Sequence, residues 1–334
     1  MRIGPFDTDK KVLVIAEIGN NHEGSFALAE KMIGLAAKAG ADAVKFQTII
    51  PEKLVSVKNT DRIEQLNRFQ LSFHDFERLS KAAEKEKIMF LSTPFDLESA
   101  AFLSGIVPAF KIASGDNNFF PLLELVAHTG RPIILSTGIS DLEQVGLTKS
   151  FIENIWKNSG IEQEMALLHC VANYPTEMKN AVLGRIKVLK DTFKTTVGYS
   201  DHTLGIEATV LSVCLGARIV EKHFTVDKQY SSFRDHSLSA DPKDLAFLVE
   251  RIKLAAETMG DPYTIMKVEK GAGVNLRRSI VAGNDLDKGS VITMDVLSWV
   301  RPGGGLAPGE ENGILGKILK RSVSKGELIL PEYF

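Results

Sequence analysis

Two histidines, His202 and His223, each close a short apolar run in the middle of the chain. Helix-like sequence separates the two runs, so residues 197–225 are expected to form strand, loop, helix and strand. The carboxyl ends of neighbouring parallel strands lie side by side on one face of a sheet. Two imidazoles placed there can hold a single divalent ion. A lone histidine is more often a core or capping residue, but a pair at matching strand ends favours a metal site.

Two lysines, Lys45 and Lys111, also close apolar runs. Because lysines are rarely buried unless they are paired, both need anionic partners. One alternative is a salt bridge to Glu17 or Asp201. The favoured alternative is a cradle for a phosphate or carboxylate, since polar side chains gather at the same strand ends. These are Gln47, Thr93, Ser114, Ser136, Tyr174 and Ser200.

Glu17 is the carboxylate at an expected strand end for which the sequence shows no obvious local partner. We therefore expect it to orient or deprotonate a water molecule. A divalent ion on the two histidines would act as a Lewis acid on a carbonyl oxygen. Taken together, these groups predict a phosphorylated substrate that is joined to a carbonyl compound.

The elements that must position these residues follow from the periodicity. Continuous apolar runs of this length are typical of strands buried on both faces. Eight occur, at residues 12–17, 43–48, 88–94, 109–115, 132–138, 165–170, 196–202 and 218–223. Helical patterns lie between them at residues 26–39, 73–87, 142–157 and 206–215, and another follows at 243–259; Ser25 and Asp141 are predicted caps.

Eight strand–helix units predict an α/β fold, a (β/α)₈ TIM barrel, with its active site at the carboxyl ends of the strands. The alternative is a doubly wound open sheet, which carries a glycine-rich phosphate turn after its first strand. Here the first strand continues into I-G-N-N-H-E-G, which does not match that turn.

The alternating pattern stops near Gly260, which divides the chain into three parts. Residues 1–260 are predicted to form the barrel, residues 261–276 a linker, and residues 277–334 a small, mostly β domain with glycine turns. A domain of that size has a marginal core, so we expect it to pack against something else.

Composition narrows the class of protein. The chain has 334 residues and a formal net charge of −2, so no basic field favours nucleic acid or an anionic membrane. It lacks an apolar run of about 20 residues and a secretory signal pattern. Cys170 and Cys214 lie in apolar runs and are both expected to be buried, reduced thiols. These features predict a cytoplasmic protein.

Ordered motifs along nearly the whole chain resemble the sialic acid synthase family, which comprises N-acetylneuraminate synthases and the related legionaminic and pseudaminic acid synthases. The last segment, with R-P-G at residues 301–303, resembles the antifreeze-like (SAF) domain of these enzymes. The motifs are I-A-E-I-G-N-N-H-E-G (15–24), G-A-D-A-V-K-F-Q-T (40–48), S-T-P-F (92–95), K-I-A-S-G (111–115), L-S-T-G (135–138), H-C-V-A-N-Y-P-T (169–176), G-Y-S-D-H-T (198–203) and E-K-H-F-T (221–225).

The resemblance implies that the protein condenses phosphoenolpyruvate with an N-acetylated hexosamine, either N-acetylmannosamine or a 2,4-diacetamido analogue. The product would be a nine-carbon 2-keto sugar acid, with phosphate released by C–O cleavage. It implies that Glu17, His202 and His223 are catalytic and that both histidines bind Mn²⁺, or Mg²⁺ or Co²⁺. It also implies six residues for phosphoenolpyruvate, Lys45, Thr93, Lys111, Ser114, Ser136 and Ser200, and four for the sugar, Gln47, Tyr174, Asp235 and Arg301. The protein would be a domain-swapped homodimer in which each SAF domain caps the partner's barrel.

The chain departs from the family pattern where the acceptor is chosen. Ala172 stands where some relatives have a polar residue, the segment 51–71 is short, and residues 233–236 read F-R-D-H rather than containing a G-P-D turn. The sugar is therefore open among neuraminic, legionaminic and pseudaminic precursors. A barrel synthase for a phosphorylated aldose would lack the tail. A non-catalytic carbohydrate- or ice-binding protein would not carry so many lysines and glutamates in the tail.

Overall fold

The computed structural model describes residues 1–260 and 266–334. The chain divides into two compact units, Met1–Gly260 and Asp261–Phe334, and each is described here by itself.

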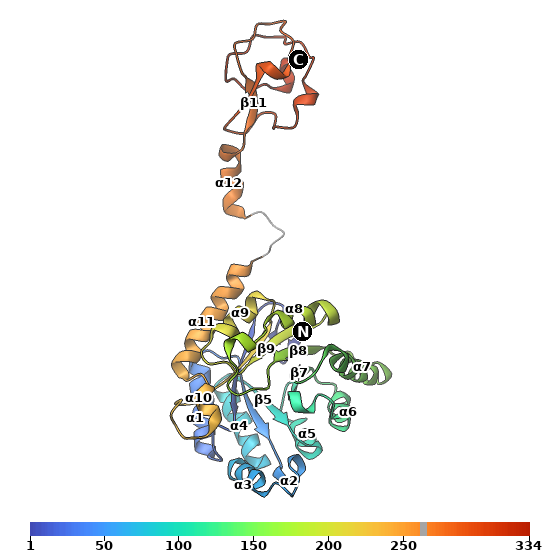
Figure 1. The fold of residues 1–334 in the computed structure, drawn as a ribbon, viewed down its shortest axis with the longest axis vertical. Coiled ribbons are helices and arrows are strands. Elements are labelled where there is room, and N and C mark those ends of the chain that lie inside the picture. The colour runs from blue at the N-terminus through green and yellow to red at the C-terminus, as the bar shows by residue number, and fades with distance from the viewer. Residues whose placement is uncertain (261–265) are drawn as a thin grey trace. The chain divides into compact units, whose positions relative to one another are not determined.

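The first unit is built around a sheet of eight parallel strands (Figure 1). Its hydrogen-bonded order is β5-β4-β3-β10-β9-β8-β7-β6. The two end strands, β5 and β6, face each other across the remaining seam, so the sheet is nearly closed. This confirms the predicted barrel. The strands are β3 (Leu13–Gly19), β4 (Ala43–Thr48), β5 (Met89–Pro94), β6 (Phe110–Ile112), β7 (Ile133–Ser136), β8 (Met165–Cys170), β9 (Thr196–Asp201) and β10 (Ile219–His223).

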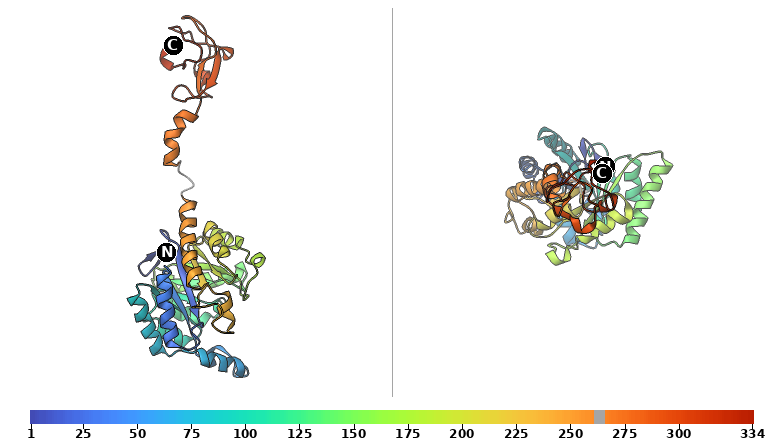
Figure 2. Two further views of the ribbon diagram at one scale, coloured as in Figure 1. Left: turned by 90° about the vertical axis from the view of Figure 1, so that its left-hand side faces the viewer. Right: turned by 90° about the horizontal axis from the view of Figure 1, so that it is seen from above.

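Helices lie on the outside of the strands (Figure 1 and Figure 2, left). The predicted caps are confirmed, since Ser25 accepts a hydrogen bond from the Leu28 amide and Asp141 from the Gln144 amide. The helices are α1 (Phe26–Lys38), α2 (Pro51–Leu54), α3 (Thr60–Phe69), α4 (Phe73–Lys85), α5 (Leu97–Leu103), α6 (Phe120–His128), α7 (Leu142–Asn158), α8 (Gly184–Phe193), α9 (Glu207–Cys214), α10 (Arg234–Leu238) and α11 (Pro242–Met259).

Side chains alternate between the inside and the outside of the barrel with the period of two that strands impose. The inward residues at the amino ends are apolar and form one core cluster that includes Leu13, Ala43 and Ile134. A hairpin that the sequence did not reveal, β1 (Arg2–Ile3) with β2 (Phe6–Asp7), adds Met1 and Ile3 to this cluster. Towards the carboxyl ends of the strands, the residues at the inward positions are polar. A polar site therefore lies above this apolar cluster, which forms the barrel floor.

The second unit contains one antiparallel pair, β11 (Ser279–Ala282) with β12 (Leu297–Val300), around a small apolar core. Short turns of helix complete it: η3 (Met294–Val296), η4 (Glu311–Gly313) and η5 (Pro331–Tyr333). Within the predicted linker, 261–276, Lys267–Leu276 form helix α12. Gly271 and Gly273 lower the helix propensity of this segment, so its sequence did not predict a helix. Residues 261–265 of the predicted linker lie outside the described residues.

The two cysteines differ in burial. Cys170 is buried as predicted, but Cys214 is exposed, so that prediction was wrong. Helix α9 buries Ala208, Thr209, Ser212 and Val213, and position 214 is turned away from that face. In the described part of the chain, no helix combines the length and the apolar character that crossing a membrane requires.

Candidate active site

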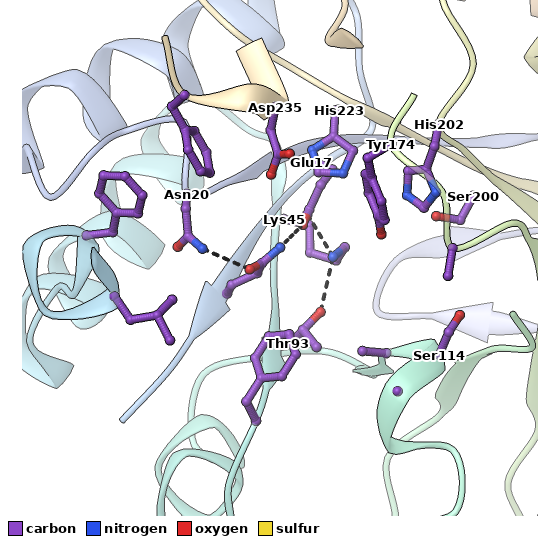
Figure 3. Close-up of a pocket in the computed structure, with 18 of the residues that line it drawn as sticks. Glu17, Asn20, Lys45, Thr93, Ser114, Tyr174, Ser200, His202, His223 and Asp235 are labelled. Atoms are coloured by element: carbon purple, nitrogen blue, oxygen red, sulfur yellow. Dashed lines mark hydrogen bonds and ion pairs between the residues drawn. The ribbon is translucent and has the colours of Figure 1, made fainter. Parts of the chain in front are cut away.

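A cavity of about 900 Å³ opens where the strands of the barrel end. Its size suits a small-molecule site. Every candidate site residue that the sequence predicted in the first unit lines it: Glu17, Lys45, Gln47, Thr93, Lys111, Ser114, Ser136, Tyr174, Ser200, His202, His223 and Asp235. Figure 3 labels Glu17, Lys45, Thr93, Ser114, Tyr174, Ser200, His202, His223 and Asp235 among them. Arg301 belongs to the second unit, and its contact with the sugar stays a prediction.

Lys45 and Glu17 form a buried ion pair across neighbouring strands (Figure 3). The Lys45 Nζ lies 2.7 Å from Glu17 Oε2 and donates to Thr93 Oγ1 at 3.1 Å. Gln47 Nε2 donates to the other carboxylate oxygen of Glu17 at 3.0 Å. The alternative of a salt bridge to Glu17 is therefore confirmed for Lys45, and the expectation that Glu17 lacks a local partner was wrong. The cause is register, since Glu17 on β3 stands directly opposite Lys45 on β4.

Lys111 lies on the other side of the cavity floor. Its Nζ donates to Ser136 Oγ at 2.7 Å and to the carbonyl oxygen of Ile112 at 3.0 Å. The alternative of a salt bridge to Asp201 was wrong, because Asp201 pairs with Lys222 on the outer face of the barrel. Both cavity lysines thus combine with hydroxyl groups, which is the donor set of an anion cradle.

Glu221 is a site residue that the sequence reasoning missed. Its carboxylate accepts from Ser200 Oγ at 2.8 Å and lies 3.8 Å from the Lys45 Nζ and 4.0 Å from the Lys111 Nζ. The strand period could have revealed it, because it precedes His223 by two residues and so shares its inward face. The same rule identifies Cys170, which also lines the cavity.

The cavity holds four buried charged groups that shift one another's pKa: two carboxyl groups, of Glu17 and Glu221, and two ammonium groups, of Lys45 and Lys111. Burial raises the pKa of Glu17, and although Lys45 opposes this, Glu221 adds to it. Burial also opposes ionisation of Glu221, but Lys111 and Lys45 outweigh it and hold the pKa of Glu221 at about 2. Burial lowers the pKa of Lys111, whereas at Lys45 the carboxylates outweigh burial and raise the pKa. Glu17 is therefore the carboxyl group in this cluster that takes up a proton more readily.

Ser114 lies in a single turn of 3₁₀ helix, η1 (Ser114–Asp116), directly after β6. Its Oγ accepts a hydrogen bond from the Gly138 amide at 3.0 Å. A Cβ on residue 138 would lie 2.7 Å from that oxygen and 3.2 Å from the carbonyl oxygen of Cys170, so a larger residue there would displace the Ser114 side chain. The L-S-T-G motif thus holds Ser114 at the cavity wall.

The two histidines meet as the sequence predicted. The ring centroids of His202 and His223 are 5.5 Å apart, and the Tyr174 ring lies 4.0 Å from that of His202 (Figure 3). His202 Nδ1 lies 2.8 Å from the carbonyl oxygen of Val171. Because a carbonyl only accepts, Nδ1 carries the hydrogen and Nε2 keeps its lone pair when the ring is neutral.

His223 also presents a neutral imidazole that can act as a ligand, but for a different reason. Among the described residues, Nδ1 of His223 is buried and has no hydrogen-bond partner. Burial lowers the pKa of His223 to about 3, which makes it a neutral ring at pH 7. At His202 burial opposes protonation too, but the contact with Cys170 outweighs it and raises the pKa.

These two side chains fit a divalent cation as a pair of nitrogen ligands. A carbonyl that fixes the remote N–H is the usual support of a metal-binding histidine. Within residues 1–260 and 266–334 no group of three or more His, Cys, Asp or Glu side chains is arranged to hold a metal. A cation would therefore need substrate or water oxygens as its remaining ligands, and its presence stays a prediction.

Comparison with known proteins identifies the family. The NeuB family model matches residues 32–264 and the SAF domain model matches residues 277–334. The chain belongs to the NeuB family. Residues 277–334 therefore form a SAF domain, with the boundaries that the sequence predicted.

Named relatives of this NeuB-family chain are synthases. It is 36% identical to the N,N'-diacetyllegionaminic acid synthase of Campylobacter jejuni, over 96% of this chain and 99% of the relative. It is 31% identical to the human N-acetylneuraminate-9-phosphate synthase, over 96% and 91%. The crystal structure of the N-acetylneuraminic acid (sialic acid) synthetase of Leptospira borgpetersenii in complex with citrate aligns with a TM-score of 0.76 and 33% identity, over 81% of this chain and 94% of that one. The chain is thus an enzyme of the sialic-acid synthase type.

The outer wall of the NeuB-family cavity comes from α3 and from the loop after β10. The rings of Phe69 and Phe233 meet edge to face at 4.8 Å between centroids and join these two elements. Gly24 packs so closely against the end of α3 that a Cβ there would lie 2.2 Å from the carbonyl oxygen of Arg68. The α3 side chains on this wall are Arg62, Gln65, Leu66, Arg68 and Phe69.

Proposed function

We propose that this protein condenses phosphoenolpyruvate with the open-chain aldehyde of an N-acetylated hexosamine. The product is a nine-carbon 2-keto sugar acid, and phosphate leaves by C–O cleavage. The observation that carries the proposal is one cavity with a lysine–hydroxyl cradle, a buried carboxylate and two paired imidazoles. The names of the relatives support it.

The anionic groups of phosphoenolpyruvate bind to the two lysines. Lys45 with Thr93 and Lys111 with Ser136 each present an ammonium group next to a hydroxyl. The proposed cradle is completed by Ser114 and Ser200, which also line the cavity. The lysine ammonium group is a compact charge on a flexible side chain, so it can adjust its position to the oxygen atoms of a bound anion.

The acceptor aldehyde binds beside the histidines. His202 and His223 are the proposed ligands of Mn²⁺, or of Mg²⁺ or Co²⁺, and the orphaned Nδ1 of His223 supports this. A divalent cation bound there supplies Lewis-acid polarisation of the carbonyl oxygen of the aldehyde. Gln47, Tyr174 and Asp235 are the proposed sugar contacts of the barrel unit.

The condensation makes a carbon–carbon bond and breaks a carbon–oxygen bond. The enol methylene adds to the aldehyde carbon, water adds to the former enol carbon, and the C–O bond to phosphate breaks as the keto group forms. The two protons of that water pass to the aldehyde oxygen and to the departing phosphate, and Glu17 orients the water, a role supported by its burial beside Lys45. Lys45, 2.7 Å from Glu17, links this carboxylate to the anion cradle.

The whole site is proposed to need two copies of the chain. In a domain-swapped homodimer, each SAF domain would cap the barrel of the partner, and Arg301 would contact the sugar. This also accounts for how a domain with so small a core is stabilised. The reaction is proposed for the cytoplasm, where phosphoenolpyruvate is produced.

Release of phosphate from phosphoenolpyruvate tests the proposal. Purified protein with Mn²⁺ is given N-acetylmannosamine, 2,4-diacetamido hexoses or phosphorylated aldoses, one at a time. We expect release that depends on an unphosphorylated N-acetylated acceptor and on Glu17, with no release by Glu17→Gln. Release with phosphorylated aldoses alone would contradict the proposed acceptor class.

A further inference from the structure

A buried ion pair lies directly behind the two cavity histidines. Lys222 Nζ is 3.0 Å from Asp201 Oδ2, and these side chains are 1% and 0% exposed. The two residues are register partners on β10 and β9. Each immediately precedes a histidine, Asp201 before His202 and Lys222 before His223. Strand alternation turns the pair to the outer face of the barrel, and neither residue lines the cavity.

Every polar atom of the Asp201 carboxylate is used. Oδ2 accepts from Thr209 Oγ1 of α9 at 2.6 Å in addition to Lys222. Oδ1 accepts from the Tyr199 hydroxyl at 3.1 Å and from the Thr203 amide at 2.8 Å. Such complete hydrogen bonding is the condition under which a buried charge pair is tolerated.

The pair also fixes the backbone around His202. The amide of Thr203 donates to Asp201, and the carbonyl oxygen of Thr203 accepts from Lys222. The carbonyl oxygen of His202 accepts from the Thr176 amide at 2.8 Å. The backbone at His202 and at Thr203 is therefore fixed by hydrogen bonds. The bond to the Thr203 carbonyl comes from Lys222, on the strand that also carries His223.

We infer that the Asp201–Lys222 pair is a positioning device that sets the separation of His202 and His223, and through it the affinity for a divalent cation. This rests on the proposed function, which assigns a cation to the two histidines. A buried ion pair is often no more stabilising than apolar side chains of the same volume, so stability alone does not account for it. Metal–nitrogen distances tolerate little displacement, and supporting residues typically change metal affinity about 10- to 100-fold.

The test is the double substitution Asp201→Asn with Lys222→Met, which removes the charges and nearly keeps the volumes. Asparagine still accepts from Tyr199 and Thr203 and donates to Thr209, so few polar groups are left unsatisfied. We expect the folded double variant to bind Mn²⁺ about 10- to 100-fold more weakly by calorimetry without substrates. Its affinity for phosphoenolpyruvate should be unchanged, and saturating Mn²⁺ should restore turnover.

Tyr199→Phe is the matched control, because it removes one hydrogen bond to Asp201 and leaves the ion pair intact. Its Mn²⁺ affinity should equal that of the wild type. If the double variant does not fold, Lys222→Gln removes one charge of the pair, keeps a donor towards Asp201 and should weaken Mn²⁺ binding more modestly. A folded double variant, or a folded Lys222→Gln, with wild-type Mn²⁺ affinity overturns the inference alone. A wild-type protein that does not bind Mn²⁺ overturns the proposed cation together with the inference.

Discussion

Lys45 Nζ lies 2.7 Å from Glu17 Oε2, so the anion cradle is in direct contact with the carboxyl group that is proposed to orient the attacking water. An anion that binds to Lys45 competes with Glu17 for the positive charge. Added negative charge then raises the pKa of Glu17 further, in the direction in which burial already shifts it. Binding of phosphoenolpyruvate is therefore coupled to uptake of a proton.

The first prediction concerns that coupling. Binding of phosphoenolpyruvate should take up protons in the pH range in which Glu17 titrates, and calorimetry in buffers of different ionisation enthalpy at a series of pH values measures this uptake directly. In Glu17→Gln this uptake should fall, because the carboxyl group that receives the proton is gone. Equal uptake by the wild type and Glu17→Gln would show that another group takes the proton.

The second prediction concerns the cradle itself. Lys111→Met removes the ammonium group next to Ser136 and should weaken binding of phosphoenolpyruvate about 10- to 100-fold, the usual range for a hydrogen bond to a charged group. The control is Lys53→Met, since Lys53 pairs with Glu98 at the surface. Titration calorimetry measures both. Unchanged affinity in Lys111→Met would remove Lys111 from the substrate site.

The third prediction follows from the low pKa of Glu221. This pKa lies at about 2 in the folded protein against an ordinary value of 4.5, so ionised Glu221 stabilises the fold above pH 4.5. The contribution is lost as the pH falls from 4.5 towards 2. Glu221→Gln should cost about 3–5 kcal/mol at neutral pH, since it leaves two buried lysines with one carboxylate fewer.

Denaturant unfolding at a series of pH values checks the sign of this effect. The difference in unfolding free energy between the wild type and Glu221→Gln should shrink on acidification below pH 4.5. A difference that stays constant, or that grows, would mean that Glu221 is not held ionised by the lysines.

The fourth prediction concerns the outer wall. Phe69→Ala removes one ring of the pair that joins α3 to the loop after β10. The KM for the acceptor should rise about 10-fold while the KM for phosphoenolpyruvate stays constant, because the wall lies on the proposed acceptor side. Phe120→Ala is the control, since Phe120 forms a similar edge-to-face pair with Phe151 outside the cavity. Equal changes in both KM values would place Phe69 in the general support of the barrel.

The fifth prediction concerns the proposed dimer. Glu17→Ala and Arg301→Ala should each be inactive alone, and mixing them under conditions of subunit exchange should recover about a quarter of wild-type activity. In the mixed dimer, the SAF domain of the Glu17→Ala chain, with its intact Arg301, would cap the barrel of the Arg301→Ala chain, with its intact Glu17. No recovery after demonstrated exchange would exclude capping of the partner's barrel.

Strand periodicity made most of the site predictable from the sequence. Ten polar residues of seven predicted runs line one cavity, together with Tyr174 and Asp235, which lie outside the runs. The predictions about the ion-pair partners of Glu17 and Asp201 were wrong because those partners are set by the register between neighbouring strands. Glu17 lies opposite Lys45 and Asp201 opposite Lys222, and no single segment encodes which residue of a neighbouring strand stands opposite. Glu221 lies inside the last apolar run rather than at its carboxyl end, so its position did not mark it as a site residue.

Other features depend on tertiary packing. The helix at Lys267–Leu276 contains two glycines, and the N-terminal hairpin has strands of only two residues. Neither length nor propensity distinguishes such segments from loops. Both make contacts distant in sequence: Ile3 packs on the barrel floor, and the Gly303 amide donates to the carbonyl oxygen of Val274 in the helix.

Product analysis with phosphoenolpyruvate labelled with ¹⁸O in the bridging C–O–P oxygen tests the central claim most directly. With Mn²⁺ and an N-acetylated hexosamine acceptor, mass spectrometry should show an acid whose mass is that of the acceptor plus pyruvic acid. The label should appear in the released phosphate, because the C–O bond breaks. Label retained in the organic product, or an acid that does not contain the acceptor, would contradict the proposed condensation.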